Sequence, residues 1–223
     1  MKTIRLGLIA GADTLTETAL LPYEAIEQVF RRMDGILYVG QMRSDALLDA
    51  LSSIAPTQAM PLSGKSQKSD DKYVLSFGQV RVGLTHGNRH PMVERYFQLQ
   101  QQLGNLYAGG RHLLDTLLQR FSDDDVNVIV FGHLQAPMHI RREGIVLINP
   151  GVVHPITPEQ AQWQLLHEQD PQRSTIFQQH IRTSKQKQQL RHSTVGILEI
   201  EPGRMIRAQV HRLPLYAYTG HNY

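Results

Sequence analysis

The sequence predicts a layered α/β domain. Short runs of β-branched and aliphatic residues recur along it, beginning with IRLGLIA at residues 4–10. Between several of these runs the apolar residues return every three or four positions, which is the period of an amphipathic helix. Other runs are separated by short sequences that contain Gly and indicate hairpins. Alternating strands and helices are typical of domains in which helices cover a sheet.

The N-terminal part alternates strand and helix. Ala25, Ile26 and Val29 lie on one face of the first expected helix. Ser44 comes directly before the second expected helix, where a serine side chain caps the free backbone N–H groups. The expected elements are a strand at 4–10, a helix at 23–32, a strand at 36–40, a helix at 45–54 and an exposed polar loop at 63–72.

The C-terminal part contains three expected hairpins. Their turns hold Gly78, Gly144 and Gly203, each between two runs of alternating or continuous apolar residues. Two helices and one buried strand lie between the first and second hairpins. The expected elements are strands at 73–77 and 80–84, helices at 92–103 and 111–121, a strand at 126–131, a hairpin over 140–148, and strands at 194–201 and 205–213.

Residues 154–192 differ in composition from the rest. They are rich in Gln and contain Trp163, and the stretch 173–191 holds five basic side chains and no acid. The apolar spacing predicts a pair of solvated helices packed on the domain, with a partner-binding surface as the alternative. Aromatic residues are sparse, so a nucleic-acid surface is not expected. The chain 1–223 is expected to form a single domain that includes this Gln-rich, basic helical segment at 154–192.

The composition excludes several classes of protein and site. The 223 residues include no Cys, which excludes disulfides, thiolate metal sites and cysteine nucleophiles. A net charge of +3 favours solubility over any particular partner. No apolar run approaches the ~20 residues of a membrane span, so no membrane association is expected and a cytoplasmic location is the default expectation. No P-loop, dinucleotide fingerprint or nucleophile elbow occurs.

Four short motifs follow expected strands or stand on turns beside them. They are Gly40-Gln41, the LTHG of residues 84–87, the GHLQ of 132–135 and the INPG of 148–151. Ligand sites of α/β proteins gather where strands end, because the loops there converge. A histidine such as His86 or His133 is by itself more often structural than a ligand. With two of them, each after its own strand and beside Gly, a structural role and a ligand site are equally open.

In their order and spacing these motifs resemble those of the calcineurin-like metallophosphoesterase superfamily, in its compact bacterial and archaeal phosphodiesterase subgroup. A retromer subunit shares that fold. The resemblance covers residues 4–151 and resumes at 193–213. It implies a four-layer α/β/β/α sandwich of two mixed sheets, with the helical insertion near 154–192. It also implies hydrolysis of phosphoesters by two metal ions that share a bridging hydroxide.

The chain departs from the superfamily pattern at most metal-ligand positions. The Gly-Asp motif is Gly40-Gln41, the Gly-Asn motif is matched by Gly64-Lys65, and the last His of Gly-His-x-His is Gln135. The first motif, Asp-x-His, aligns either with residues 11–13 or with 13–15. In the second alignment Asp13 survives and the His is replaced by Leu15.

Charge balance decides what these replacements mean. Two divalent ions carry four positive charges, and at most one carboxylate, that of Asp13, remains to offset them. We therefore expect no dinuclear centre. His86 and His133, with Asp13 and with Asn88, His90 or Gln135 nearby, leave at most one weak site for Zn²⁺, Ni²⁺ or Mn²⁺. Otherwise no cofactor is expected.

Three functions remain open. The first is a catalytically inactive or weakly active binding or scaffold protein, with residues 154–192 as its surface for a protein partner. The second is an active hydrolase of phosphomonoesters or phosphodiesters that uses one metal ion or a Lys/His site. In it His133 would donate a proton to the leaving oxygen and Lys65 would clamp the phosphate. The third is binding of phosphate or a nucleotide by Lys65, His86 and His133 without hydrolysis. An alternative for Lys65 is that it points into solvent from the polar loop.

Overall fold

The computed structural model describes most of the chain, and every structural statement below refers to the part that it describes. The described residues are 2–11, 18–40, 45–60, 72–87, 106–132, 134, 136–184, 192–202 and 206–213.

Ten strands form two five-stranded mixed sheets in this part of the chain. The first sheet has the order β10-β9-β1-β2-β3, with β1 parallel to β2, β2 parallel to β3, and β9 antiparallel to both β1 and β10. Its strands are β1 (Ile4–Ile9), β2 (Gly35–Tyr38), β3 (Thr57–Ala59), β9 (Thr194–Ile200) and β10 (Ile206–Arg212).

The second sheet has the order β4-β5-β6-β8-β7. Its three central strands are parallel, and a hairpin partner runs antiparallel on each edge. Its strands are β4 (Lys72–Phe77), β5 (Val80–Thr85), β6 (Val128–Phe131), β7 (Met138–Arg142) and β8 (Ile145–Asn149). The two predicted hairpins of this sheet, β4–β5 and β7–β8, are confirmed.

Three hydrophobic cores separate four layers. The first core lies between sheet one and the helices α1 (Tyr23–Phe30) and α2 (Asp45–Ser52), the second lies between the sheets, and the third lies between sheet two and α4 (Leu106–Arg120). Side chains alternate across each strand, so in β1 Leu8 enters the second core and Ile9 the first. The predicted four-layer α/β/β/α sandwich of two mixed sheets is confirmed.

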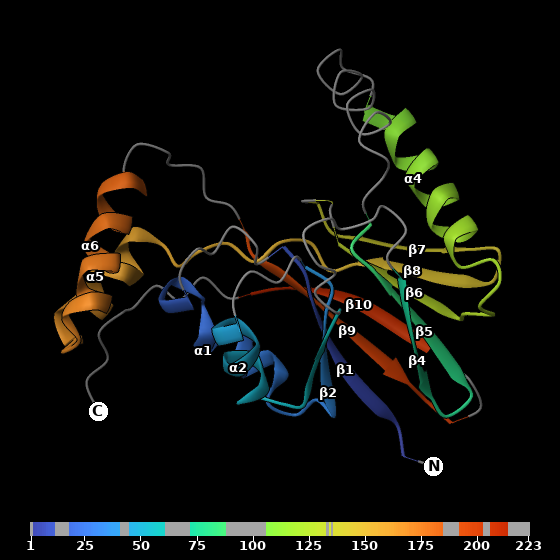
Figure 1. The fold of residues 1–223 in the computed structure, drawn as a ribbon, viewed down its shortest axis with the longest axis horizontal. Coiled ribbons are helices and arrows are strands. Elements are labelled where there is room, and N and C mark those ends of the chain that lie inside the picture. Colours follow the sequence, from blue (N-terminus) through green and yellow to red (C-terminus); the bar gives the residue numbers. More distant parts are fainter. Residues whose placement is uncertain are drawn as a thin grey trace.

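The helical segment predicted near 154–192 is present as α5 (Pro158–His167) and α6 (Pro171–Ser184). Figure 1 shows this pair at the opposite end of the molecule from α4. Thr157 begins α5 with a capping box, in which its side chain and that of Gln160 each accept from the other's backbone N–H. Phe177 is fully buried in the first core, and Ile156 N donates to Leu20 O at 2.9 Å. These contacts join the pair to the body of the domain.

Two elements differ from the sequence prediction. The short strand β3 was not predicted, because three residues after Pro56 carry too little pattern; its parallel pairing with β2 makes it a strand. Helix α4 begins at Leu106, so Gly109 and Gly110 lie inside it and not before it. Two helical glycines cost about 1 kcal/mol each relative to Ala, and the burial of the leucines that follow offsets this cost. The helix predicted at 92–103 lies outside the described residues.

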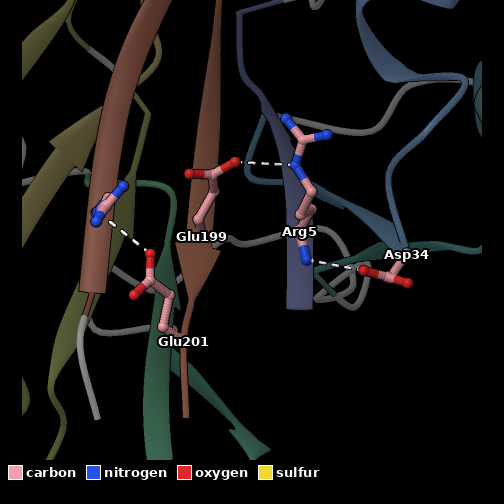
Figure 2. Close-up of polar contacts among 5 residues, drawn as sticks. Arg5, Asp34, Glu199 and Glu201 are labelled. Carbon is pink, nitrogen blue, oxygen red and sulfur yellow. Dashed lines mark hydrogen bonds and ion pairs between the residues drawn. The ribbon is translucent and has the colours of Figure 1, made fainter. Parts of the chain in front are cut away.

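Charged side chains at the N-terminal end of β1 form a small network (Figure 2). Arg5 donates from Nε to Glu199 on β9 and from its backbone N to Asp34, each at 2.9 Å. The Arg5 backbone N–H, and then the Lys2 ammonium, hold the pKa of the Asp34 carboxyl below its ordinary value. The ionised carboxylate is therefore the form that the folded chain favours.

Asp34→Asn is expected to lower the free energy of unfolding near pH 7 by less than about 1 kcal/mol, the range of exposed ion pairs. Because the folded-state pKa is lowered, the contribution is present above the ordinary value of 3.8 and is lost as the pH falls through the folded-state pKa. Urea unfolding of both proteins at several pH values between about 7 and 3 measures this. A difference that stays constant over this range would contradict it.

Candidate functional site

The carboxyl ends of strands from both sheets meet at one place. His86 follows β5 of the second sheet, and its ring Nδ1 lies 3.0 Å from Val39 O, just after β2 of the first sheet. Gly132 follows β6 and packs between them. A Cβ atom at Gly132 would lie 3.0 Å from Val39 O and 3.3 Å from His86 O. A side chain at Gly132 would therefore force these strand ends a few tenths of an ångström apart.

The contact with Val39 determines the protonation pattern of the His86 ring. A carbonyl oxygen only accepts, so Nδ1 carries the hydrogen that it donates to Val39 O. In the neutral ring the lone pair is then on Nε2. A backbone carbonyl in this role is the usual partner of a metal-binding or proton-transferring histidine. His86 as a whole residue is 9% exposed, so it lies in a largely buried position.

Strands β5 and β8 end with the same local device. Thr85 Oγ1 accepts from the backbone N–H of Gly87 at 3.3 Å, and Asn149 Oδ1 accepts from that of Gly151 at 2.8 Å. Each of these glycines has a left-handed backbone, with φ of +86° and +88°. A side chain that bonds the backbone two residues ahead turns the chain tightly. Both motif loops therefore leave their strands in defined directions.

Helix α4 contacts the turn after β5 through a side chain. The Arg120 guanidinium at its C-terminal end donates from Nη1 to Thr85 Oγ1 at 2.6 Å. This hydrogen bond ties the outer helix layer to the residue that precedes His86.

Of the site residues predicted from the sequence, the structure describes only His86. His86 lies at the strand ends, as predicted. Asp13, Leu15, Gln41, Lys65, Asn88, His90, His133 and Gln135 lie outside the described residues. For two of the motifs the described residues include a direct sequence neighbour. Gly40 precedes Gln41, and Gly132 and Leu134 flank His133. Within the described ranges, no three His, Asp or Glu side chains form a group that could hold a metal ion.

Three residues of the site were missed by the sequence analysis. Thr85 and Asn149 belong to the LTHG and INPG motifs, but their side chains were not assigned a role. Arg120 belongs to no motif. Threonine and asparagine immediately before or near glycine at a strand end are a turn signal, which could have identified the first two. Nothing local in the sequence identifies Arg120, because it reaches Thr85 across 35 positions.

The structure is similar over nearly its whole length to solved proteins. It matches a Thermotoga maritima protein solved by NMR with a TM-score of 0.51 and 18% identity, over 94% of this chain and 99% of that one. It matches Vps29 of Entamoeba histolytica, solved as a single mutant, with a TM-score of 0.50 and 14% identity, over 95% and 100%. The chain has the calcineurin-like metallophosphoesterase fold. The resemblance in the motifs is thereby confirmed at the level of fold.

Sequence comparison agrees with this metallophosphoesterase fold. The chain is 24% identical over 149 residues to a protein of Methanocaldococcus jannaschii named "probable metallophosphoesterase". The alignment covers 67% of this chain and 68% of that protein. No family model matches the chain.

The superfamily implies metal ions, so the donors present must be compared with what such ions require. His86 would supply one nitrogen donor, because the bond from Nδ1 to Val39 O leaves the lone pair of the neutral ring on Nε2. The donors named by the other motifs fit a pair of ions poorly. The motif resemblance matches Gln41, an amide, with the bridging carboxylate and Lys65, an ammonium, with a neutral oxygen ligand; both residues lie outside the described part of the chain, so these matches stay predictions.

Proposed function

We propose that the chain is a metallophosphoesterase-fold protein that binds a phosphate-containing ligand and a protein partner, with little or no hydrolysis. The proposal rests on one contrast: the strand ends have the contacts of the fold, but the sequence lacks most of the expected metal-binding residues. Among the described residues, hydrogen bonds and close packing join the strand ends at Val39, His86, Gly132 and Asn149. The residues that would hold metal ions there are replaced at Gln41, Lys65 and Gln135.

Electrostatics explains why this combination favours binding over hydrolysis. Without the bridging carboxylate, two divalent ions about 4 Å apart repel each other by many kcal/mol in a partly desolvated site. Lys65 adds a further positive charge in the same motif set. The remaining groups, Lys65, His86 and His133, suit an anion such as a phosphate group. Asp13, His86 and His133 would hold at most one weakly bound ion.

A second candidate is slow hydrolysis of a phosphoester. The hydrogen bond from His86 Nδ1 to Val39 O favours it, because the same bond orients catalytic and metal-binding imidazoles. In this version Lys65 would clamp the phosphate and His133 would protonate the leaving oxygen. A metal ion held by His86 would polarise the phosphoryl oxygen.

The test of the proposed function is turnover of bis(4-nitrophenyl) phosphate with Mn²⁺, Ni²⁺ or Zn²⁺ added. We expect the unmodified protein and His133→Ala to release nitrophenolate at the same rate, equal to the rate with metal alone. We also expect inorganic phosphate to shift histidine ring signals in NMR titrations. Turnover that disappears in His133→Ala would establish the second candidate in place of the first.

The outward face of α5 is the proposed surface for a protein partner. Trp163 and Leu166 are 39% and 76% exposed there, although the inner face of the α5–α6 pair is buried. Deletion of residues 154–192 would remove core residues such as Phe177, so surface changes test the proposal better. In pull-downs from the source cells, Trp163→Ala with Leu166→Ser should lose partners that the control Arg182→Ala retains. Unchanged partners would rule out this surface.

No helix among the described residues is long and apolar enough to cross a membrane. The cytoplasmic location stays a prediction.

A further inference from the structure

We propose that Asn149 is a positioning residue that clamps the chain on both sides of His133. The inference deepens the proposed function, because His133 is one of the proposed anion-binding residues. The observations behind it are the hydrogen bonds of Asn149 to Gly132, Leu134 and Gly151, all of which the structure describes.

The Asn149 side chain joins two of the motif loops. Its Nδ2 donates to Leu134 O at 3.0 Å and to Gly132 O at 3.3 Å, and its Oδ1 accepts from Gly151 N at 2.8 Å. These partners also settle the orientation of the amide, since both carbonyl oxygens only accept and the backbone N–H only donates. The residue is 0% exposed.

The two acceptors bracket a single residue. Gly132 and Leu134 are the immediate sequence neighbours of His133, and Leu134 N also donates to Gly132 O at 2.8 Å. Asn149 thus holds the peptide carbonyls before and after His133 and, through its other end, the turn after β8. A buried amide with all its hydrogens used is a rigid support, because breaking either bond leaves a buried carbonyl without that donor.

The chemistry requires an amide and not a carboxylate. Aspartate has nearly the same shape and keeps an acceptor for Gly151 N. It has no hydrogen for Gly132 O or Leu134 O when ionised. Asn149→Asp therefore loses both donated bonds when ionised and at least one when protonated, because a protonated carboxyl has a single hydrogen, and it keeps the turn. A matched control exists at the other end of β6, where Asn127 Oδ1 accepts from Arg81 N at 2.8 Å. Asn127→Asp makes the same chemical change and keeps that bond.

The test is NMR of the histidine rings and of phosphate binding in the full chain. In Asn149→Asp we expect the His133 ring signals and the Leu134 amide signal to shift, and inorganic phosphate to bind roughly tenfold more weakly, the size of effect typical of residues that support a site. Asn127→Asp should change neither. His133 signals unchanged in folded Asn149→Asp would overturn the proposal.

Two results are kept separate by this design. If the unmodified protein binds no phosphate, the proposed function fails, while the ring signals still report on the clamp. If Asn149→Asp does not fold, NMR of the unmodified protein tests the clamp instead. The proposal then predicts two distinct, slowly exchanging Nδ2 hydrogen signals for Asn149, and rapid exchange of both with water would overturn it.

Discussion

Gly151→Ala is expected to lower the free energy of unfolding by about 2–5 kcal/mol, from backbone strain and steric overlap together. Gly151 has φ of +88°, a left-handed conformation that residues with a Cβ adopt at a cost. Its added Cβ would overlap Thr194 Oγ1, so the folded chain would have to shift at this point. Urea unfolding followed by circular dichroism measures the loss.

Two variants separate the causes of this loss. Gly144 has φ of +79°, but no non-neighbouring atom of the described residues lies within 4 Å of its Cβ position, so Gly144→Ala should show the backbone strain alone, about 1–2 kcal/mol. Thr194→Ala removes the overlapping oxygen, which has no hydrogen-bond partner among the described residues. Adding it to Gly151→Ala should recover the steric part. If Gly151→Ala loses no more unfolding free energy than Gly144→Ala does, the overlap with Thr194 Oγ1 does not exist.

Much of the fold could be predicted from the sequence because its signals are local. The hairpins at 73–84 and 140–148 carry turn residues between apolar runs, and both were found in the structure. The order of strands within each sheet carries no such local signal. The motif resemblance implied two mixed sheets but no strand order, and the pairing between β1 and β9 joins residues nearly two hundred positions apart.

The site shows the same division between local and distant signals. His86 could be predicted because a histidine and a glycine follow a strand. The contacts that support it could not, because Val39 reaches the His86 ring from another sheet and Arg120 reaches the preceding residue, Thr85, from another layer. Asn149 lay within a recognised motif, but its hydrogen bonds to Gly132 and Leu134 depend on the parallel pairing of β6 with β8.

The second large effect concerns metal binding. Gln41→Asp with Lys65→Asn makes the candidate site two charges more negative and supplies the missing bridging carboxylate. One charge changed about 4 Å from an ion is worth about 4 kcal/mol at an effective dielectric of 20. We therefore expect Mn²⁺ to bind at least about a hundredfold more tightly than to the unmodified protein, measured by titration calorimetry.

A control is needed to show that the gain in Mn²⁺ affinity does not come from the change in net charge alone. Gln58 is exposed on β3 in the described structure, so Gln58→Asp with Lys65→Asn has the same net charge without a carboxylate at position 41. This control should bind Mn²⁺ far more weakly than the variant with Gln41→Asp. Equal affinities would mean that position 41 is not a ligand position.

The most direct test of the proposed loss of the dinuclear centre is the metal content of the unmodified protein. The chain would be stripped with a chelator, reloaded separately with Mn²⁺, Ni²⁺ and Zn²⁺, desalted, and its ions counted by mass spectrometry. Replacement of the bridging carboxylate by Gln41 predicts no ion, or at most one, per chain. Two ions per chain would contradict it, and would mean that other carboxylates complete a working two-metal phosphoesterase.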